Sequence, residues 1–333
     1  IYFLPVIFMD HVIRIHQTGG ADVLQYETQE IPQPKPGEVL LRQTAVGLNF
    51  IDVYFRTGVY PAPQLPFIPG LEGAGIVESL GEGVTGLSLG DRVGYAAQPL
   101  GAYAQARVIP AERVVRLPDE VDDRVAAAMM LKGMTAQYLL RSTVQLKSGD
   151  TILFHAAAGG VGLIVCQWAK HLGVNIIGTV GSEEKAQLAK SHGCTHTVRY
   201  NDEDFVERVN DITDGKGVDA VYDSVGKDTF DKSMDCLKKR GTLVLFGQSS
   251  GKVPSFDPAA LSAKGSIYLT RPTLFHYTDT REDLVSCSSE LFDVLINGAV
   301  TPDINQEYPL ADARQAHEDL EGRRTTGATI LIP

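Results

Sequence analysis

Residues 151–162 read TILFHAAAGGVG, and this stretch decides the fold of the second part of the chain. The apolar run Thr151 to His155 predicts a buried strand, and a helical pattern follows from Val161 to Leu172. A glycine-rich turn between a strand and a helix lets the backbone approach a pyrophosphate, and the helix N-terminus offers it unpaired N–H groups. Ala157 stands at the first glycine position of the usual fingerprint. The stretch therefore predicts a dinucleotide-binding loop, with a merely structural turn as the alternative.

Strands and helices alternate on the far side of this loop. We expect strands at 175–180, 218–223 and 242–246, and helices at 183–191 and 202–212. Such βαβ repetition implies a doubly wound parallel sheet with helices on both faces. The fold class is therefore α/β.

The chain before the loop has a different pattern of apolar and turn-forming residues. From Met9 to about Pro118, short apolar runs alternate with turn signals such as Pro34-Lys35-Pro36-Gly37, which predicts a compact β-rich domain. An Ala- and Met-rich helix at about 125–140 links the two domains. After about Arg271, a helix at 281–296 and a strand at 328–332 fit neither pattern and are expected to complete the first domain.

These patterns predict domain bounds. We assign 9–130 to the β-rich domain, 131–270 to the nucleotide-binding domain and 271–333 to the completion of the first. Residues 1–8 are interpreted as an artefactual leader, with a genuine extra strand as the alternative, because the run is short and is broken by Pro5.

Bulk composition narrows the classes of function. A length of 333 residues favours two domains, and a formal net charge of -11 disfavours nucleic acid and anionic lipid as partners. The four cysteines are far apart and form no C-x-x-C pair, so we expect no structural zinc and a reducing, cytoplasmic setting.

The end of the second predicted strand indicates which nucleotide binds. An NAD-selective site places Asp or Glu there for the ribose 2′-hydroxyl, but this chain reads Gly178-Thr179-Val180-Gly181-Ser182, with Lys185 one helical turn later. Ser182 and Lys185 can donate to a 2′-phosphate that a carboxylate would repel. The cofactor is therefore expected to be NADPH, with a solvated surface lysine as the alternative.

Three phrases carry a family resemblance: NFIDVYFRTG at 49–58, HAAAGGVG at 155–162 and FGQSSG at 246–251. In this order they resemble the zinc-free, zeta-crystallin-like quinone oxidoreductases of the medium-chain dehydrogenase/reductase superfamily. The resemblance implies a GroES-like catalytic domain, a Rossmann-type cofactor domain, NADPH-dependent reduction of quinones, and a homodimer formed through an edge strand at 266–269.

Zinc alcohol dehydrogenases of that superfamily carry a Gly-His-Glu turn and an early cysteine as metal ligands. Here the turn is Gly70-Leu71-Glu72, and the early segment offers Asn49 and no cysteine. We therefore expect no metal at the site and interpret Glu72 as a structural carboxylate.

The resemblance also implies site residues. Asn49, Tyr54 and Tyr60 would line the substrate side, where amide and phenol groups suit a carbonyl; simple packing is the alternative for the two tyrosines. The expected cofactor contacts are Phe50, Ile51, Asp52, Thr135, Tyr138, Gly159, Gly160, Val161, Gly181, Ser182, Lys185, Tyr200, Val225, Phe246, Gly247, Gln248, Ser249, Pro272, Thr273, Leu274 and Arg323.

Two other stretches have competing interpretations. His192-Gly193-Cys194-Thr195-His196 looks like a soft metal site, but Gly193 is a natural helix stop. The aromatic segment 275–277 either shapes acceptor preference or packs. For the whole chain the alternatives are an enone or 2-alkenal double-bond reductase and, from another class, a non-catalytic structural or RNA-binding nucleotide-binding protein.

Overall fold

The structure is a computed structural model that describes residues 9–61 and 64–333, so the predicted leader at 1–8 lies outside the described residues. The chain divides into two compact units. Unit 1 comprises the chain up to Leu131 together with Thr280–Phe292 and Pro302–Pro333, and unit 2 comprises Lys132–Asp279 and Asp293–Thr301. The domain bounds drawn from the sequence stay a prediction.

Unit 2 is built on a six-stranded parallel sheet in the order β10-β9-β8-β11-β12-β13. This order reverses direction between β8 and β11, as in doubly wound dinucleotide-binding sheets. Its strands are β8 (Thr151–Phe154), β9 (Asn175–Val180), β10 (His196–Arg199), β11 (Val218–Asp223), β12 (Leu237–Leu245) and β13 (Tyr268–Thr270). The predicted α/β fold class is confirmed.

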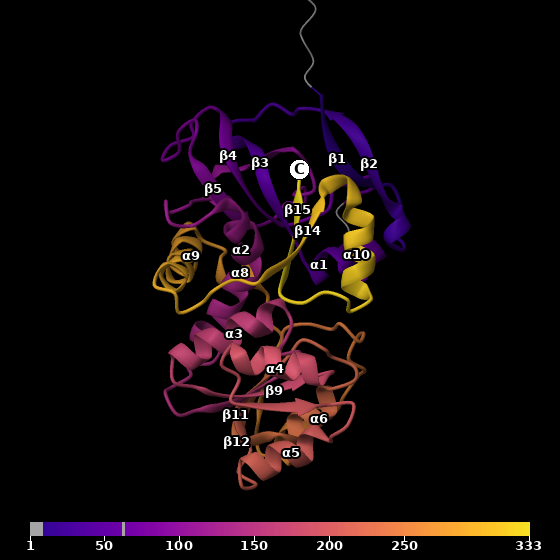
Figure 1. Cartoon of the computed structure of the whole chain (residues 1–333), viewed down its shortest axis with the longest axis vertical. Coiled ribbons are helices and arrows are strands. Elements are labelled where there is room, and N and C mark those ends of the chain that lie inside the picture. Colours follow the sequence, from indigo (N-terminus) through magenta and orange to yellow (C-terminus); the bar gives the residue numbers. More distant parts are fainter. Residues whose placement is uncertain (1–8, 62–63) are drawn as a thin grey trace, which may run out of the picture. The chain divides into compact units, whose positions relative to one another are not determined.

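Helices cover both faces of this sheet, with α3 and α4 on one side and α5 and α6 on the other (Figure 1). The helices are α3 (Gly160–His171), α4 (Glu183–Ser191), α5 (Phe205–Ile212), α6 (Phe230–Asp235), α7 (Ala259–Ala263) and α8 (Leu274–Tyr277). Apolar side chains of α5 and α6, such as Val209 and Met234, join Leu153 and Val221 of the central strands in one buried cluster. Ile152 and Ala220, which alternate with these strand residues and point to the other face, are also fully buried. The central strands are therefore apolar on both faces, which explains their unbroken apolar runs.

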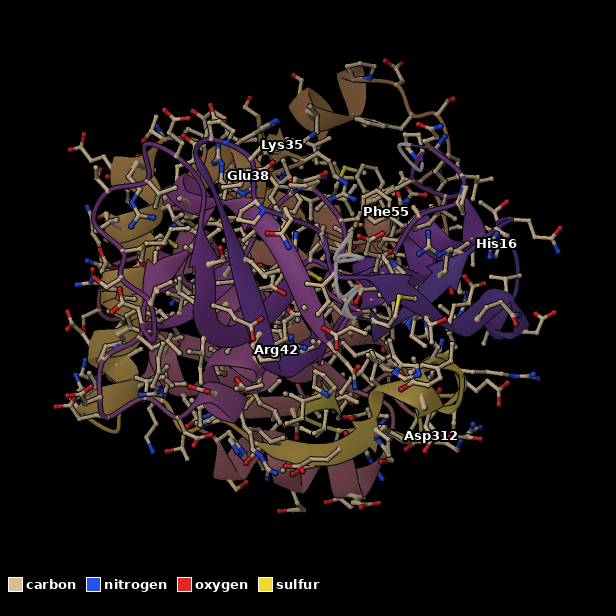
Figure 2. The ribbon with its side chains drawn as sticks, turned by 90° about the horizontal axis from the view of Figure 1, so that it is seen from above. His16, Lys35, Glu38, Arg42, Phe55 and Asp312 are labelled. Carbon is tan, nitrogen blue, oxygen red and sulfur yellow. The ribbon has the colours of Figure 1, made fainter. Side chains whose placement is uncertain are left out.

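Unit 1 contains a mostly antiparallel sheet in the order β14-β15-β3-β4-β5-β7, with β6 also paired to β3 and a separate β1-β2 hairpin. Its strands are β1 (Met9–Ile15), β2 (Leu24–Glu30), β3 (Glu38–Leu48), β4 (Glu72–Leu80), β5 (Arg92–Ala96), β6 (Ala106–Pro110), β7 (Val115–Arg116), β14 (Ile304–Pro309) and β15 (Ala328–Ile332). Figure 2 shows β3 running from Glu38, beside Lys35, past Arg42.

The C-terminal segment returns to unit 1 as expected. β15 pairs with β3 through Thr329–Leu48, Ile330–Gly47 and Leu331–Val46, and in Figure 1 the yellow β15 lies beside the indigo β3. The remaining helices are α1 (Phe50–Thr57), α2 (Asp123–Tyr138), α9 (Arg281–Ile296) and α10 (Ala313–Glu321). Within the described ranges, no helix is long and apolar enough to cross a membrane.

Candidate active site

The turn after β3 positions the residues expected on the substrate side. Asn49 is the N-cap of α1, with an extended backbone at φ -136° and ψ 154°. Asp52, three residues later, accepts the Asn49 backbone N–H at 2.9 Å, which is one half of a capping box. Helix α1 therefore starts at a defined residue, and Asn49 has a fixed backbone.

The side chain of Asn49 is held by a second carboxylate. Its amide nitrogen donates to Oε2 of Glu72 at 2.7 Å, and Oε1 of Glu72 accepts the backbone N–H of Leu131 in α2 at 2.6 Å. Glu72 is completely buried, and Asn49 is 5% exposed. A buried carboxylate that receives hydrogen bonds on both oxygens fits the structural role expected for Glu72.

Aromatic rings surround this turn. The rings of Tyr54 and Tyr60 lie 5.1 Å apart, and Phe50 meets Tyr54 edge-on at 5.4 Å. Gly58 ends α1 in the left-handed conformation (φ 80°), which brings the chain back so that the Tyr60 N–H donates to the Tyr54 carbonyl. The structure thus brings four predicted residues together, with Phe50 and Tyr54 on α1, Asn49 at its N-cap and Tyr60 just after its end, although both tyrosine rings also pack against neighbours.

Behind α1 lies a buried polar network that links distant parts of unit 1. Arg56 donates to Nδ1 of His317 at 3.0 Å and forms an ion pair with Glu321 at 2.8 Å. Because a guanidinium can only donate, Nε2 of His317 carries the proton and faces the Tyr103 hydroxyl at 3.0 Å, which in turn donates to Asp52 at 3.1 Å.

The surroundings of the His317 imidazole keep it neutral. Burial, together with the positive charge of Arg56, lowers the pKa of His317 to about 3. Burial and the nearby Asp52 carboxylate raise the pKa of Tyr103 well above its usual value. His317 therefore stays neutral and Tyr103 keeps its proton near neutral pH, and the Tyr103 hydrogen bond fixes the orientation of Asp52. The expected contact of Asp52 with nicotinamide stays a prediction.

The phosphate loop of unit 2 is shaped by small residues. Ala156 has a left-handed backbone (φ 58°), Gly159 is the N-cap of α3, and a Cβ on Gly162 would lie 2.5 Å from the Ala156 carbonyl oxygen. The Ala157 methyl at the first fingerprint position is accommodated because its neighbour on β9 is Gly178, whose own Cβ would lie 2.5 Å from it. Helix α3 therefore starts with Gly159 and Gly160, which carry no side chains, and Val161 follows them.

The end of β9 gathers the residues expected around a 2′-phosphate. Ser182 caps α4 by accepting the Lys185 backbone N–H at 3.3 Å. Tyr200 follows the adjacent strand β10, and its hydroxyl approaches Gly181 so closely that a Cβ there would lie 2.6 Å away. Gly181, Ser182, Lys185 and Tyr200 are thus neighbours in the structure.

The loops after β11 and β12 are tied together. Asp223 accepts the backbone N–H groups of Val225 and Gly226 on one oxygen, and the Ser249 N–H donates to the Ser224 carbonyl at 3.1 Å. A Cβ on Gly247 would lie 2.6 Å from the Ser224 carbonyl oxygen. The predicted set Val225, Phe246, Gly247, Gln248 and Ser249 therefore lies at the carboxyl edge of the sheet beside the β8–β11 switch point.

The other predicted residues are placed as follows. Tyr138 is buried in α2 and stacks on Tyr277 at 4.5 Å, so within unit 2 the aromatic segment 275–277 packs against the linking helix. Thr135 and Leu274 are also buried, Pro272 is buried and Thr273 is half-buried. Arg323 is exposed in unit 1, with a left-handed backbone after α10.

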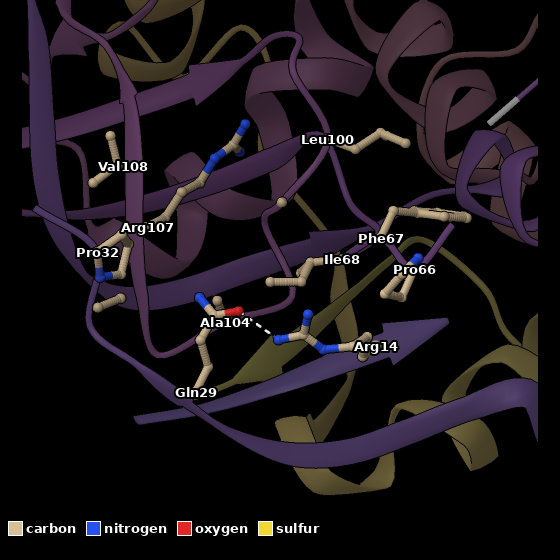
Figure 3. A pocket seen from close by; sticks show the side chains of 12 residues that line it. Arg14, Gln29, Pro32, Pro66, Phe67, Ile68, Leu100, Ala104, Arg107 and Val108 are labelled. Atoms are coloured by element: carbon tan, nitrogen blue, oxygen red, sulfur yellow. Dashed lines mark hydrogen bonds between the residues drawn. The ribbon is translucent and has the colours of Figure 1, made fainter. Parts of the chain in front are cut away.

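A separate hollow of about 270 Å³ lies in unit 1 (Figure 3). Arg14 and Arg107 are among its lining residues, and Arg14 donates to Gln29 at 2.6 Å. Arg107 lies over the Tyr95 ring at 4.4 Å and donates to the Pro99 carbonyl. None of the predicted site residues lines this hollow.

Comparison with known proteins places the chain in a family. Residues 35–119 match the family described as alcohol dehydrogenase GroES-like domain, and residues 160–288 match the one described as zinc-binding dehydrogenase. A quinone oxidoreductase of Pseudomonas aeruginosa is 54% identical over 96% of this chain and 99% of its own length. The chain belongs to the quinone oxidoreductase family.

Two further proteins are similar to this chain over nearly its full length. The crystal structure of Escherichia coli quinone oxidoreductase complexed with NADPH superimposes with a TM-score of 0.96 at 48% identity, covering 97% of this chain and 100% of that one. A 2-haloacrylate reductase of a Burkholderia species is 46% identical over 96% of this chain and 98% of its own length.

The zinc in the second family description does not fit the residues present. Leu71, fully buried, occupies the histidine position, and both oxygens of Glu72 receive hydrogen bonds from Asn49 and Leu131. Within residues 9–61 and 64–333, no group of three or more His, Cys, Asp or Glu side chains could hold a metal ion. The His192–His196 cluster also lacks such a group, and α4 ends just before Gly193, which has a φ of 104°.

Sequence reasoning missed several residues near the site. Arg199, at the end of β10, lies 3.6 Å from Glu183 in the first turn of α4, and its only sequence signal is its position beside the β9 edge. Tyr103 and His317 carried no signal, because they come from a loop and a helix far from Asp52 in sequence.

Proposed function

We propose that this chain reduces quinones with NADPH and without a metal ion. The observation that carries the proposal is the Gly159–Gly162 loop at the β8–β11 switch point, combined with the absence of a carboxylate at the end of β9. Ligands of such sheets bind outside the carboxyl ends of the strands, at the switch point. The close similarity to quinone oxidoreductases over nearly the full chain supports the same reaction.

The residues of unit 2 fit a phosphorylated dinucleotide. The N-terminal turn of α3, with Gly160 and Val161, would hold the pyrophosphate, because a bare glycine surface and unpaired N–H groups face it. Ser182, Lys185 and Tyr200 would hold the 2′-phosphate. When bound, NADPH supplies the hydride.

The remaining predicted cofactor contacts are proposed on the resemblance alone. Those expected near the nicotinamide and its ribose are Phe50, Ile51, Asp52, Thr135, Tyr138 and Val225. The other expected cofactor contacts are Phe246, Gly247, Gln248, Ser249, Pro272, Thr273, Leu274 and Arg323.

Unit 1 supplies groups that suit a flat carbonyl acceptor. Asn49 offers an amide, and Tyr54 and Tyr60 offer rings and hydroxyls. A quinone that accepts a hydride becomes a hydroquinone monoanion, which then takes a proton from water to give the hydroquinone. Conjugation spreads the negative charge, so a hydrogen-bond donor at the oxygen can replace a Lewis acid.

A steady-state assay tests the proposal. Purified protein, with folding verified, is expected to oxidise NADPH with 1,4-benzoquinone and 1,4-naphthoquinone, and to keep its activity after treatment with a zinc chelator. Failure to oxidise NADPH with any quinone would contradict the proposal, and loss of activity on chelation would contradict its metal-free part.

Reduction of an activated carbon–carbon double bond is a second candidate. The similarity to a 2-haloacrylate reductase favours it, since both reactions place a hydride on an electron-poor conjugated system. A panel of 2-alkenals, enones and 2-haloacrylate, compared with quinones by kcat/KM, separates the two candidates.

We also propose a homodimer in the cytoplasm, without a nucleic-acid partner. β13 is the last strand of the six-stranded sheet, and Tyr268 on it is 62% exposed, as expected of an edge that pairs with a second copy. All four cysteines are free and buried, which suits a reducing compartment. Tyr268→Asp is expected to yield monomers in light scattering, whereas a mass unchanged from the wild type would contradict this interface.

A further inference from the structure

The orientation of the Asn49 amide is determined by its partner. A carboxylate can only accept hydrogen bonds, so the atom of Asn49 that faces Glu72 is the amide nitrogen. An amide nitrogen carries two hydrogens, and Glu72 Oε2 takes one of them. A second N–H of fixed direction is left for another acceptor.

The carboxylate that imposes this orientation cannot turn away. Glu72 is completely buried on β4, and its other oxygen receives the Leu131 N–H at 2.6 Å. Gly47 on β3 leaves the space it needs, because a Cβ there would lie 2.1 Å from Glu72 Oε2 and 2.3 Å from the Ala127 carbonyl oxygen. Residues of β3, β4 and α2 therefore fix the position of the Glu72 carboxylate independently of its hydrogen bond to Asn49.

We infer that Glu72 is a positioning residue that presents the second N–H of Asn49 as the hydrogen-bond donor for the oxygen of the acceptor. This inference rests on the proposed reduction of a conjugated carbonyl compound. The acceptor oxygen becomes negatively charged as hydride arrives, so a donor there stabilises the transition state, whereas an amide oxygen would repel it. Glu72 touches neither substrate nor cofactor in this role and acts through Asn49.

Glu72→Gln tests the inference because it keeps the size of the side chain and exchanges donor and acceptor only in the hydrogen bond to Asn49. Its amide oxygen can still accept the Leu131 N–H, which cannot reorient. Its amide nitrogen then faces Asn49, whose own amide must flip to accept, and the flipped amide presents oxygen to the substrate. We expect kcat/KM for quinones to fall on the order of a hundredfold, as for loss of an oxyanion donor, while the Kd for NADPH stays unchanged.

Glu78→Gln is the matched control. Glu78 lies on the same strand, and its side chain pairs with Arg42 instead of Asn49. The same loss of one charge there is expected to leave kcat/KM at the wild-type value. An equal loss in both variants would overturn the inference, because it would indicate a general effect of charge.

A double-mutant cycle separates positioning from a merely structural role. If Glu72 acts through Asn49, Glu72→Gln has no further effect on kcat/KM in an Asn49→Ala background. Full additivity of the two losses would overturn the inference.

Asn49→Ala provides a test that does not need Glu72→Gln to fold. It removes the donor without placing a second carboxylate beside the buried Glu72, so kcat/KM for quinones is expected to fall on the order of a hundredfold while the Kd for NADPH stays unchanged, and an unchanged kcat/KM would contradict the inference. Quinone affinity, measured by fluorescence quenching, is expected to follow the order wild type above Asn49→Ala. Wild-type protein inactive on quinones would contradict the proposed function alone, since the affinity order still decides whether Asn49 acts as a donor.

Discussion

The phosphate loop of unit 2 and the Asn49 turn of unit 1 are built in opposite ways. The loop depends on the absence of side chains: a Cβ on Gly162 would lie 2.6 Å from the Ala157 carbonyl oxygen, and its neighbours are adjacent in sequence. The turn depends on residues that come from far away. Glu72, which accepts the Leu131 N–H, orients Asn49, and Tyr103, whose hydroxyl faces His317, donates to Asp52. A binding loop that uses backbone groups is encoded by one short stretch of sequence. A turn that uses side chains depends on hydrogen bonds from distant parts of its domain.

The largest expected effect concerns the backbone loop. Gly162→Ala forces the carbonyls of Ala156 and Ala157 to move, and misplacing a bound reactant by about 1 Å lowers the reaction rate on the order of a hundredfold. We expect kcat/KM for NADPH, measured in a steady-state assay, to fall by that factor. Gly83→Ala, in unit 1, is the control, because no atom lies within 4 Å of a Cβ there. An equal loss with both substitutions would contradict the role of close packing.

The next effect concerns charge at the end of β9. Lys185→Ala is expected to raise the Kd for NADPH about tenfold to a hundredfold and to leave that for NADH unchanged, since a charge-assisted hydrogen bond contributes about 1.5–3 kcal/mol. Lys190→Ala, in the last turn of the same helix, is the control. If NADPH and NADH weaken equally, Lys185 does not read the 2′-phosphate.

The buried network of unit 1 should give a pH-dependent stability. The pKa of His317 is about 3 in the folded chain and about 6.5 when unfolded, so the unfolded state binds more protons between these values. The free energy of unfolding is therefore expected to fall as pH drops, by about 2 kcal/mol between pH 6.5 and pH 5 from this group.

Urea unfolding at a series of pH values, compared with His317→Gln, checks this contribution. Glutamine can accept from Arg56 and donate to Tyr103 without titrating. The difference in slope between the two proteins isolates the histidine. Parallel pH profiles would show that His317 does not stay neutral in the fold.

The smallest effect returns to the phosphate loop. Ala156 has a φ of 58°, a conformation that costs an L-residue about 1–2 kcal/mol and glycine much less. Ala156→Gly is expected to raise the free energy of unfolding by about 0.5–1 kcal/mol after the entropy loss of glycine. Ala158→Gly, where φ is not positive, should lower it. A loss of stability with Ala156→Gly would contradict strain at this residue.

Element prediction succeeded where periodicity was strong. The predicted bounds of α4, α9, β9, β11 and β15 agree with the structure, because each has a clear apolar pattern or a capping residue. The helix expected at 202–212 starts at Phe205, since Asp204 caps it by accepting the Val206 and Glu207 N–H groups. The strand expected at 242–246 starts earlier, at Leu237, because polar residues on an exposed stretch hid it. β14 and α10 carried no signal strong enough to be predicted.

The sequence by itself determined the dinucleotide loop, the missing histidine at Leu71 and the residue types offered to a carbonyl acceptor. These depend on adjacent residues and on backbone conformation, which a short stretch encodes. Only the tertiary structure decided which atom of Asn49 points outward and what keeps Asp52 in place. Those answers depend on hydrogen bonds between residues 23 to 214 positions apart, and no local pattern encodes such pairs.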